Sequence, residues 1–126
     1  MPKPLIVRAC AAALAGAVAM GAAGTADGQT AGQRSAYEYA LRCWAVAGYI
    51  ASEPGVRRNV HASAQAEASA RRAFDASVRM GTVLGYSGPQ ISEDLDSTAR
   101  LEGALMLRDR SYFERTKAAC QQLGLI

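Results

Sequence analysis

Apolar side chains recur every three or four positions through most of the chain after residue 30, which is the period of an amphipathic α-helix. Stretches that alternate apolar and polar residues are short and β-branched residues are few, so strands are not expected. Turn residues divide the pattern into four segments, which we predict to be helices over residues 32–52, 59–84, from 92 onward, and 111–124. The predicted fold is all-α, a small antiparallel four-helix bundle.

Residues that favour helix ends mark most of these boundaries. Asn59 and Ser92 are good N-cap residues for the second and third helices. Ser111 and Glu114 have the spacing of a capping box at the start of the fourth helix. Gly85 is a suitable C-cap, and the residues after it form a predicted turn.

The N-terminal segment, residues 1–26, has the pattern of a secretory signal peptide. Residues 1–8 contain two basic residues and no acidic one, and residues 9–23 carry no charge and are small or apolar. A basic start, a short apolar stretch and small residues before a cleavage point are typical of such leaders. We expect cleavage after Ala23 or Ala26, and the alternative is an uncleaved N-terminal anchor. After cleavage, no stable membrane insertion is expected.

Removal of the leader changes the charge of the mature domain, residues 27–126. The whole chain has 14 basic and 11 acidic residues, a formal net charge of +3. Loss of Lys3 and Arg8 leaves 12 of those 14 basic residues against 11 acidic ones, about +1. Basic and acidic residues are also interspersed, whereas nucleic-acid-binding domains gather basic residues on one face. We therefore expect no nucleic-acid partner.

Two cysteines, Cys43 and Cys120, remain in the mature domain. An even number of cysteines in a small exported domain indicates a disulfide, which here would join the first and last helices. The alternative is two separate buried thiols. With the leader, this pattern favours a periplasmic or secreted location. The richness in alanine and arginine suits a GC-rich genome, and we expect the source to be a Gram-negative bacterium.

The first predicted helix has two apolar arcs. One includes Trp44, and the other contains Cys43 with Tyr39, Val46 and Ile50. So wide an apolar surface indicates a helix packed on two sides, or one whose second arc binds a partner. The presence of Cys43 favours internal packing, and Tyr39, Val46 and Ile50 form the candidate partner surface if the second alternative holds.

Glu102 is the most unusual polar residue, because it lies within the apolar arc of the third predicted helix. We expect that arc, which includes Leu101 and Leu105, to be buried, as we expect for Phe74 on the preceding helix. A carboxylate there would be desolvated unless an arginine or a tyrosine pairs with it. Glu102 is therefore either a general acid or base, half of an ion pair between helices, or a residue at the edge of the arc. With Trp44, it is the candidate buried polar site.

No arrangement of residues specifies an enzyme. The chain has a single histidine, His61, no HExxH motif and no phosphate-binding glycine loop, so no metal, cofactor or catalytic residue is assigned. The favoured function is a non-enzymatic accessory or binding protein acting on another envelope protein, as an inhibitor, immunity factor, chaperone or complex subunit. The alternative is a helical bundle that binds a small ligand in its core near Trp44 and Glu102, and an enzyme is the least favoured class.

Overall fold

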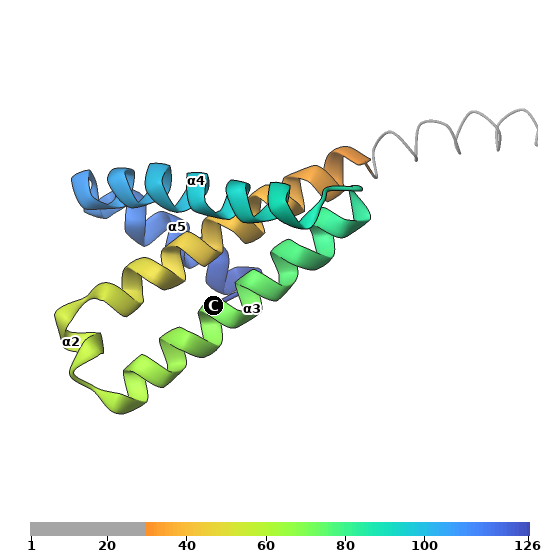
Figure 1. Ribbon diagram of the computed structural model, residues 1–126. Helices are drawn as coiled ribbons and strands as arrows, with labels where there is room; N and C mark the ends of the chain where they lie inside the picture. Colours follow the sequence, from red (N-terminus) through yellow and green to blue (C-terminus); the bar gives the residue numbers. More distant parts are fainter. Residues whose placement is uncertain (1–29) are drawn as a thin grey trace, which may run out of the picture. The chain divides into compact units, whose positions relative to one another are not determined.

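The computed structural model describes residues 30–126, and every regular element within that range is a helix. The first helix is described over residues 30–52. It is followed by α2 (Pro54–Arg57), α3 (Val60–Val83), α4 (Gly88–Arg108) and α5 (Arg110–Gln122). Figure 1 shows that the chain reverses direction between the first helix and α3, between α3 and α4, and again at α5. The all-α prediction is confirmed for these residues, while the predicted leader and its cleavage sites lie outside them.

The number of helices differs from the predicted four because of α2. Pro54, which follows the predicted end of the first helix, occupies the first turn of a one-turn helix that was not predicted. Proline suits that position because its fixed φ angle is helical and its missing N–H would have no partner there. The short α2 therefore forms most of the connection between the first helix and α3.

The predicted cap of α3 is confirmed, whereas the predicted start of α4 is wrong. The side chain of Asn59 accepts a hydrogen bond from the backbone N–H of Ala62 at 3.0 Å, and Gly85, with φ of +83°, follows the end of α3. The N-cap of α4 is Ser87, which accepts from the N–H of Gln90, and not Ser92. Ser92 therefore lies inside the helix, because the expected turn already contains an adequate cap.

The expected capping box of the last helix is also wrong. Asp109 caps α5 by accepting a hydrogen bond from the N–H of Tyr112 at 3.1 Å. Ser111 and Glu114 lie within the helix, and Glu114 forms a surface ion pair with Arg110. Asp109 thus separates α4 from α5 as a single residue, which makes the corner between them tight.

A disulfide joins Cys43 of the first helix to Cys120 of α5, as predicted, with 5.6 Å between the Cα atoms. Both cysteines are fully buried. They belong to a core cluster to which the first helix, α3, α4 and α5 all contribute: Cys43, Ala45, Val46, Ala73, Met106, Phe113 and Cys120. The disulfide is therefore a buried covalent link between the first helix and the last.

A second core cluster packs the first helix against α4. It consists of Tyr37, Leu41, Ile91 and Leu95. Gly81 of α3 lies against this cluster so closely that a Cβ atom added to it would lie 2.7 Å from a side-chain carbon of Ile91. The absence of a side chain at Gly81 therefore lets Ile91 of α4 pack closely against α3.

Burial along the first helix corrects the candidate partner surface. Val46 has no exposed surface, and the half-buried Ile50 packs against the cluster around the disulfide. The wide apolar arc is thus explained by packing on two sides, and of the three proposed surface residues only Tyr39, which is 39% exposed, lies open to solvent.

Candidate functional site

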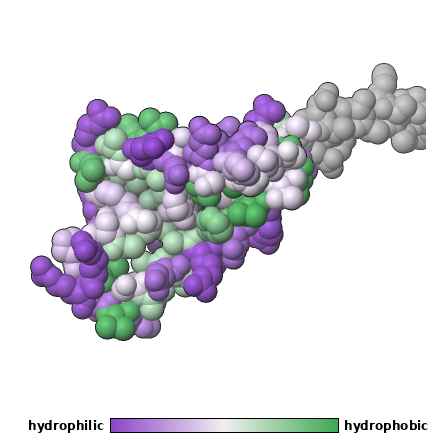
Figure 2. Space-filling model, in the orientation of Figure 1, coloured by the Kyte–Doolittle hydropathy of each residue, from purple (hydrophilic) through white to green (hydrophobic). Residues whose placement is uncertain are grey.

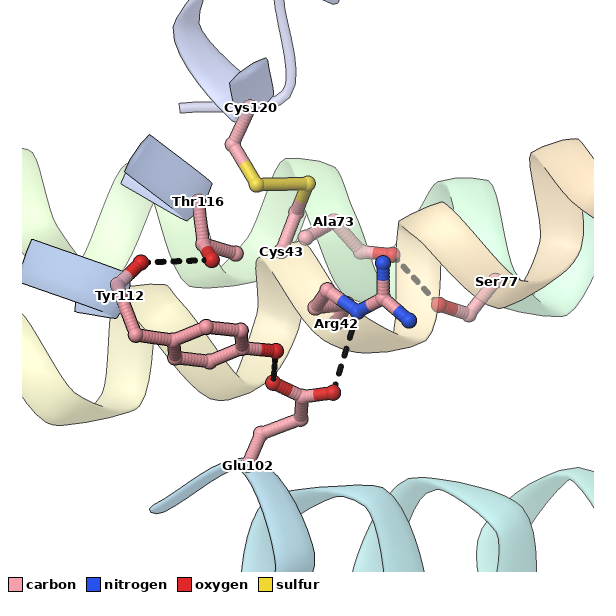
Figure 3. Close-up of a disulfide and its surroundings, with 8 residues drawn as sticks. All are labelled: Arg42, Cys43, Ala73, Ser77, Glu102, Tyr112, Thr116 and Cys120. Atoms are coloured by element: carbon pink, nitrogen blue, oxygen red, sulfur yellow. Dashed lines mark hydrogen bonds and ion pairs between the residues drawn. A yellow bond between two sulfur atoms is a disulfide. The ribbon is translucent and has the colours of Figure 1, made fainter. Parts of the chain in front are cut away.

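Glu102 is held by donors from two other helices. The Nε of Arg42 donates to one carboxylate oxygen at 3.0 Å, and the hydroxyl of Tyr112 donates to the other. Figure 3 shows Arg42 and Tyr112 approaching the carboxylate from the first helix and from α5. Only 8% of Glu102 is exposed. Of the three roles considered for this residue, the ion pair between helices is the one that the structure contains.

The two partners of Glu102 are themselves positioned. The backbone carbonyl of Tyr112 accepts a hydrogen bond from the hydroxyl of Thr116 at 2.8 Å, and the guanidinium of Arg42 lies 5.3 Å from the centre of the Tyr39 ring. Burial raises the pKa of Tyr112, and its hydrogen bond to the Glu102 carboxylate raises it further. The phenol is therefore held in its protonated form, which is the form that can donate to Glu102.

This arrangement fixes how α4 is rotated about its axis. Both carboxylate oxygens of Glu102 already accept hydrogen bonds, so the group is a positioned acceptor between helices. Adjacent residues of a helix point about 100° apart, so that turning Glu102 inward turns its neighbour outward. Leu101 is accordingly 70% exposed and Leu105, one turn later, is 41% exposed, against the expectation that both are buried.

We refer to Leu101 and Leu105 as the leucine face of α4. Ala104, between them, is also exposed. Leu107 is 77% exposed but lies roughly 120° around the helix from Leu101. Figure 2 shows strongly hydrophobic side chains over the end of α4, among charged ones. Sequence reasoning missed this surface because Leu101 and Leu105 also fit a buried apolar arc. In that interpretation Glu102 is a single polar residue that interrupts the arc.

Phe74 is a second apolar residue that was expected in the core and lies outside it. It is 43% exposed and Val78, one turn later, is 37% exposed. Both line a cavity of about 270 Å³ between α3 and α4, whose far wall includes Ile91 and Leu95. The core side of α3 consists of small residues, Ala66, Ala73, Ala76, Ser77 and Gly81. They allow the neighbouring helices to approach closely and leave no room for a phenyl ring.

Trp44 and Glu102 do not share a site. Trp44 lines a cavity of about 410 Å³ with Tyr49 and five small residues, Ala45, Gly48, Ala70, Ala99 and Gly103. The carboxylate of Glu102 is bonded to Arg42 and Tyr112 and does not line this cavity. The candidate buried polar site therefore separates into an ion-pair cluster around Glu102 and an uncharged cavity beside Trp44.

A second tyrosine–carboxylate contact ties the first helix to α4. The hydroxyl of Tyr37 donates to Asp94 at 2.7 Å, and the rings of Tyr37 and Tyr86 meet edge to face, with 5.2 Å between their centres. Burial, together with the carboxylate of Asp94, raises the pKa of Tyr37. Sequence reasoning did not identify this pair, because nothing in the spacing of residues 57 positions apart indicates their contact.

Within residues 30–126, no helix is long and apolar enough to cross a bilayer. In the same range, no three His, Cys, Asp or Glu side chains are grouped as metal ligands would be. No protein-family model, curated protein or solved structure matches the chain. The described residues form an all-helical domain with a buried disulfide and a part-buried ion pair between helices.

Proposed function

We propose that this chain is a small non-enzymatic binding protein that acts on another protein of the cell envelope through the leucine face of α4. The observation that supports this most is the inverted burial on one turn of α4, where Glu102 is 8% exposed and Leu101 is 70% exposed.

Burying a carboxylate while exposing a neighbouring leucine is costly for the stability of an isolated domain. Complete burial of a leucine side chain stabilises a fold by about 1.5–3 kcal/mol, a gain that Leu101 largely forgoes. A buried carboxylate also loses its hydration, and an ion pair often does no more than offset that loss. Scattered exposed leucines are ordinary on protein surfaces. Leu101 and Leu105 lie one turn apart, and the part-buried ion pair between Arg42 and Glu102 holds α4 so that both face solvent. Such a pair is instead suited to a partner that covers it.

The proposed compartment rests on separate observations. The disulfide between Cys43 and Cys120 requires an oxidising environment to form and persist. The N-terminal sequence has the pattern of a secretory leader. Both support export to the periplasm or beyond, where the partner would be an envelope or extracellular protein. The roles of inhibitor, immunity factor, chaperone and complex subunit all require such a surface.

The test is affinity purification of the tagged protein from periplasmic extract, with mass spectrometry of the proteins that co-purify. Leu101→Arg places a charge in the centre of the leucine face and is expected to remove the partner. Leu107→Arg makes the same change on another side of the same helix and is expected to retain it. Both residues are exposed, so neither change should unfold the domain. Recovery of the same proteins in equal amounts with both variants would contradict the proposal.

A further inference from the structure

The cavity beside Trp44 differs in chemistry from the leucine face and lies between three helices. Its walls come from the first helix, α3 and α4, and its volume is about 410 Å³, within the range of about 300–1,000 Å³ found for small-molecule sites. It reaches the surface at Gly48, which is exposed. Figure 2 shows pale, weakly hydrophobic surface between the first helix and α3, in contrast to the charged surface around it.

Two glycines of the lining are not explained by helix packing. Gly48 lies in the first helix and Gly103 in α4, and a Cβ atom added to either would meet no atom within 4 Å. Glycine in a helix interior is destabilising relative to alanine, so it usually reflects a close approach. Gly81 shows such an approach, because its added Cβ would lie 2.7 Å from Ile91. Gly48 and Gly103 instead keep space open.

The two aromatic walls are fixed by the core. Trp44 packs against both core clusters, and the ring of Tyr49 lies 4.8 Å from that of Phe113, centre to centre. The indole N–H of Trp44 and the hydroxyl of Tyr49 form no hydrogen bond within the described residues. Both residues are half-buried, and no buried side-chain N or O atom of the described residues lacks a partner, so neither donor is completely enclosed.

We propose that this cavity binds a small neutral molecule with a flat apolar body. The lining contains no charged side chain, so a charged ligand would lose hydration without gaining a partner. Flat aromatic walls favour stacking or edge contacts with a ring. This site is independent of the leucine face, and its occupancy does not depend on a protein partner.

Trp44 is the only tryptophan in the chain, so its fluorescence reports directly on the cavity. The probe is N-phenyl-1-naphthylamine, a neutral compound of a naphthalene and a phenyl ring that absorbs where tryptophan emits. Titration of the purified, disulfide-bonded protein is expected to quench Trp44 through energy transfer, with saturation. The matched anionic probe, 1-anilinonaphthalene-8-sulfonate, has the same rings plus a sulfonate. It is expected to bind at least about tenfold more weakly, because burial of an unpaired charge is unfavourable.

Cavity-filling variants decide whether the probe occupies this site. Gly103→Leu and Gly48→Leu are expected to weaken neutral-probe binding at least about tenfold, because a leucine side chain fills space that the ligand needs. Gly32→Leu is the matched control, since Gly32 is also helical, has no atom within 4 Å of an added Cβ and lies outside the lining. Leu101→Arg is expected to bind the probe like wild type, which separates this site from the leucine face.

If either leucine variant fails to fold, Gly48→Ala/Gly103→Ala provides the smaller change, since a methyl group fits at both positions. This double variant is expected to bind the neutral probe severalfold more weakly without loss of helical content. Equal probe affinity in the wild type and a folded cavity-filled variant would overturn the proposal. Equal affinity for the neutral and anionic probes, or no saturable quenching of Trp44, would overturn it as well.

Discussion

Tyr112 of α5 donates its hydroxyl hydrogen to Glu102 of α4, across the tight corner that Asp109 forms between the two helices. The other oxygen of the same carboxylate accepts from Arg42 of the first helix at 3.0 Å. One buried acid therefore sets the orientation of three helices. It also determines that Leu101 and Leu105 face solvent.

We predict that Glu102→Gln and Tyr112→Phe each lower the free energy of unfolding by about 1–2 kcal/mol, because the first removes the charge that accepts both hydrogen bonds and the second removes one of its donors. The double variant should lose less unfolding free energy than the sum of the two single losses, with a coupling energy of about 1 kcal/mol, since the two residues share one contact. Urea denaturation of the oxidised proteins measures all three values. Strictly additive losses would show that the contact does not contribute to stability.

Tyr37, which is buried, and the half-buried Tyr112 predict a loss of stability at alkaline pH. The pKa values of Tyr37 and Tyr112 are raised in the folded protein above the ordinary value of 10.0, mainly by burial and then by their carboxylate partners. The contribution of these tyrosines to the free energy of unfolding is complete below pH 10. It decreases as the pH rises above 10, because the unfolded chain then releases protons that the folded chain retains. Chemical denaturation between pH 8 and 11 should show this decrease.

Tyr37→Phe/Tyr112→Phe is the matched control, because phenylalanine keeps the ring and removes the ionisable hydroxyl. Its unfolding free energy should decrease less steeply above pH 10 than that of the wild type. The same slope in both proteins would assign the alkaline transition to other groups.

The sequence predicted the helical class, the disulfide and the cap at Asn59, because each depends on local pattern or on a count of cysteines.

Prediction from the sequence failed mainly where tertiary contacts choose between local alternatives. The start of α4 is a local exception: Ser87 and Ser92 are both competent caps, and Pro89, which suits the first turn of a helix, favours the earlier one. The leucines around Glu102 satisfied an apolar arc, but the partners that turn Glu102 inward, Arg42 and Tyr112, lie on other helices. The cavity beside Trp44 depends on glycines from two helices, which no single-helix pattern brings together.

The disulfide should be a major contributor to stability. It connects residues 77 positions apart, and for such a loop the chain-entropy model gives about 4.5 kcal/mol. Cys43→Ala/Cys120→Ala, or reduction of the wild type, should therefore lower the thermal midpoint strongly, as measured by circular dichroism at 222 nm. A midpoint unchanged by both treatments would contradict a structural role for the disulfide.

A side chain at Gly81 should displace Ile91 and destabilise the fold. Gly81→Ala places a methyl group 2.7 Å from a carbon of Ile91 and 3.1 Å from the Tyr37 ring, so we expect it to be destabilising by about 1–3 kcal/mol. Gly48→Ala should instead be stabilising by about 0.5–1 kcal/mol, since it removes the entropic cost of a helical glycine in open space. Thermal unfolding of the two single variants measures this difference in sign. A stabilising Gly81→Ala would show that α3 and α4 do not approach this closely.

The central claim, that the leucine face of α4 contacts a protein partner, is tested most directly by site-specific photo-cross-linking in the producing cell. A photoreactive phenylalanine derivative replaces Leu101 in one strain and Leu107 in another, two exposed positions on different sides of one helix. Irradiation should yield a discrete adduct with one envelope protein from position 101 and little or none from position 107. No adduct from position 101, or the same adducts in equal yield from both positions, would contradict the account.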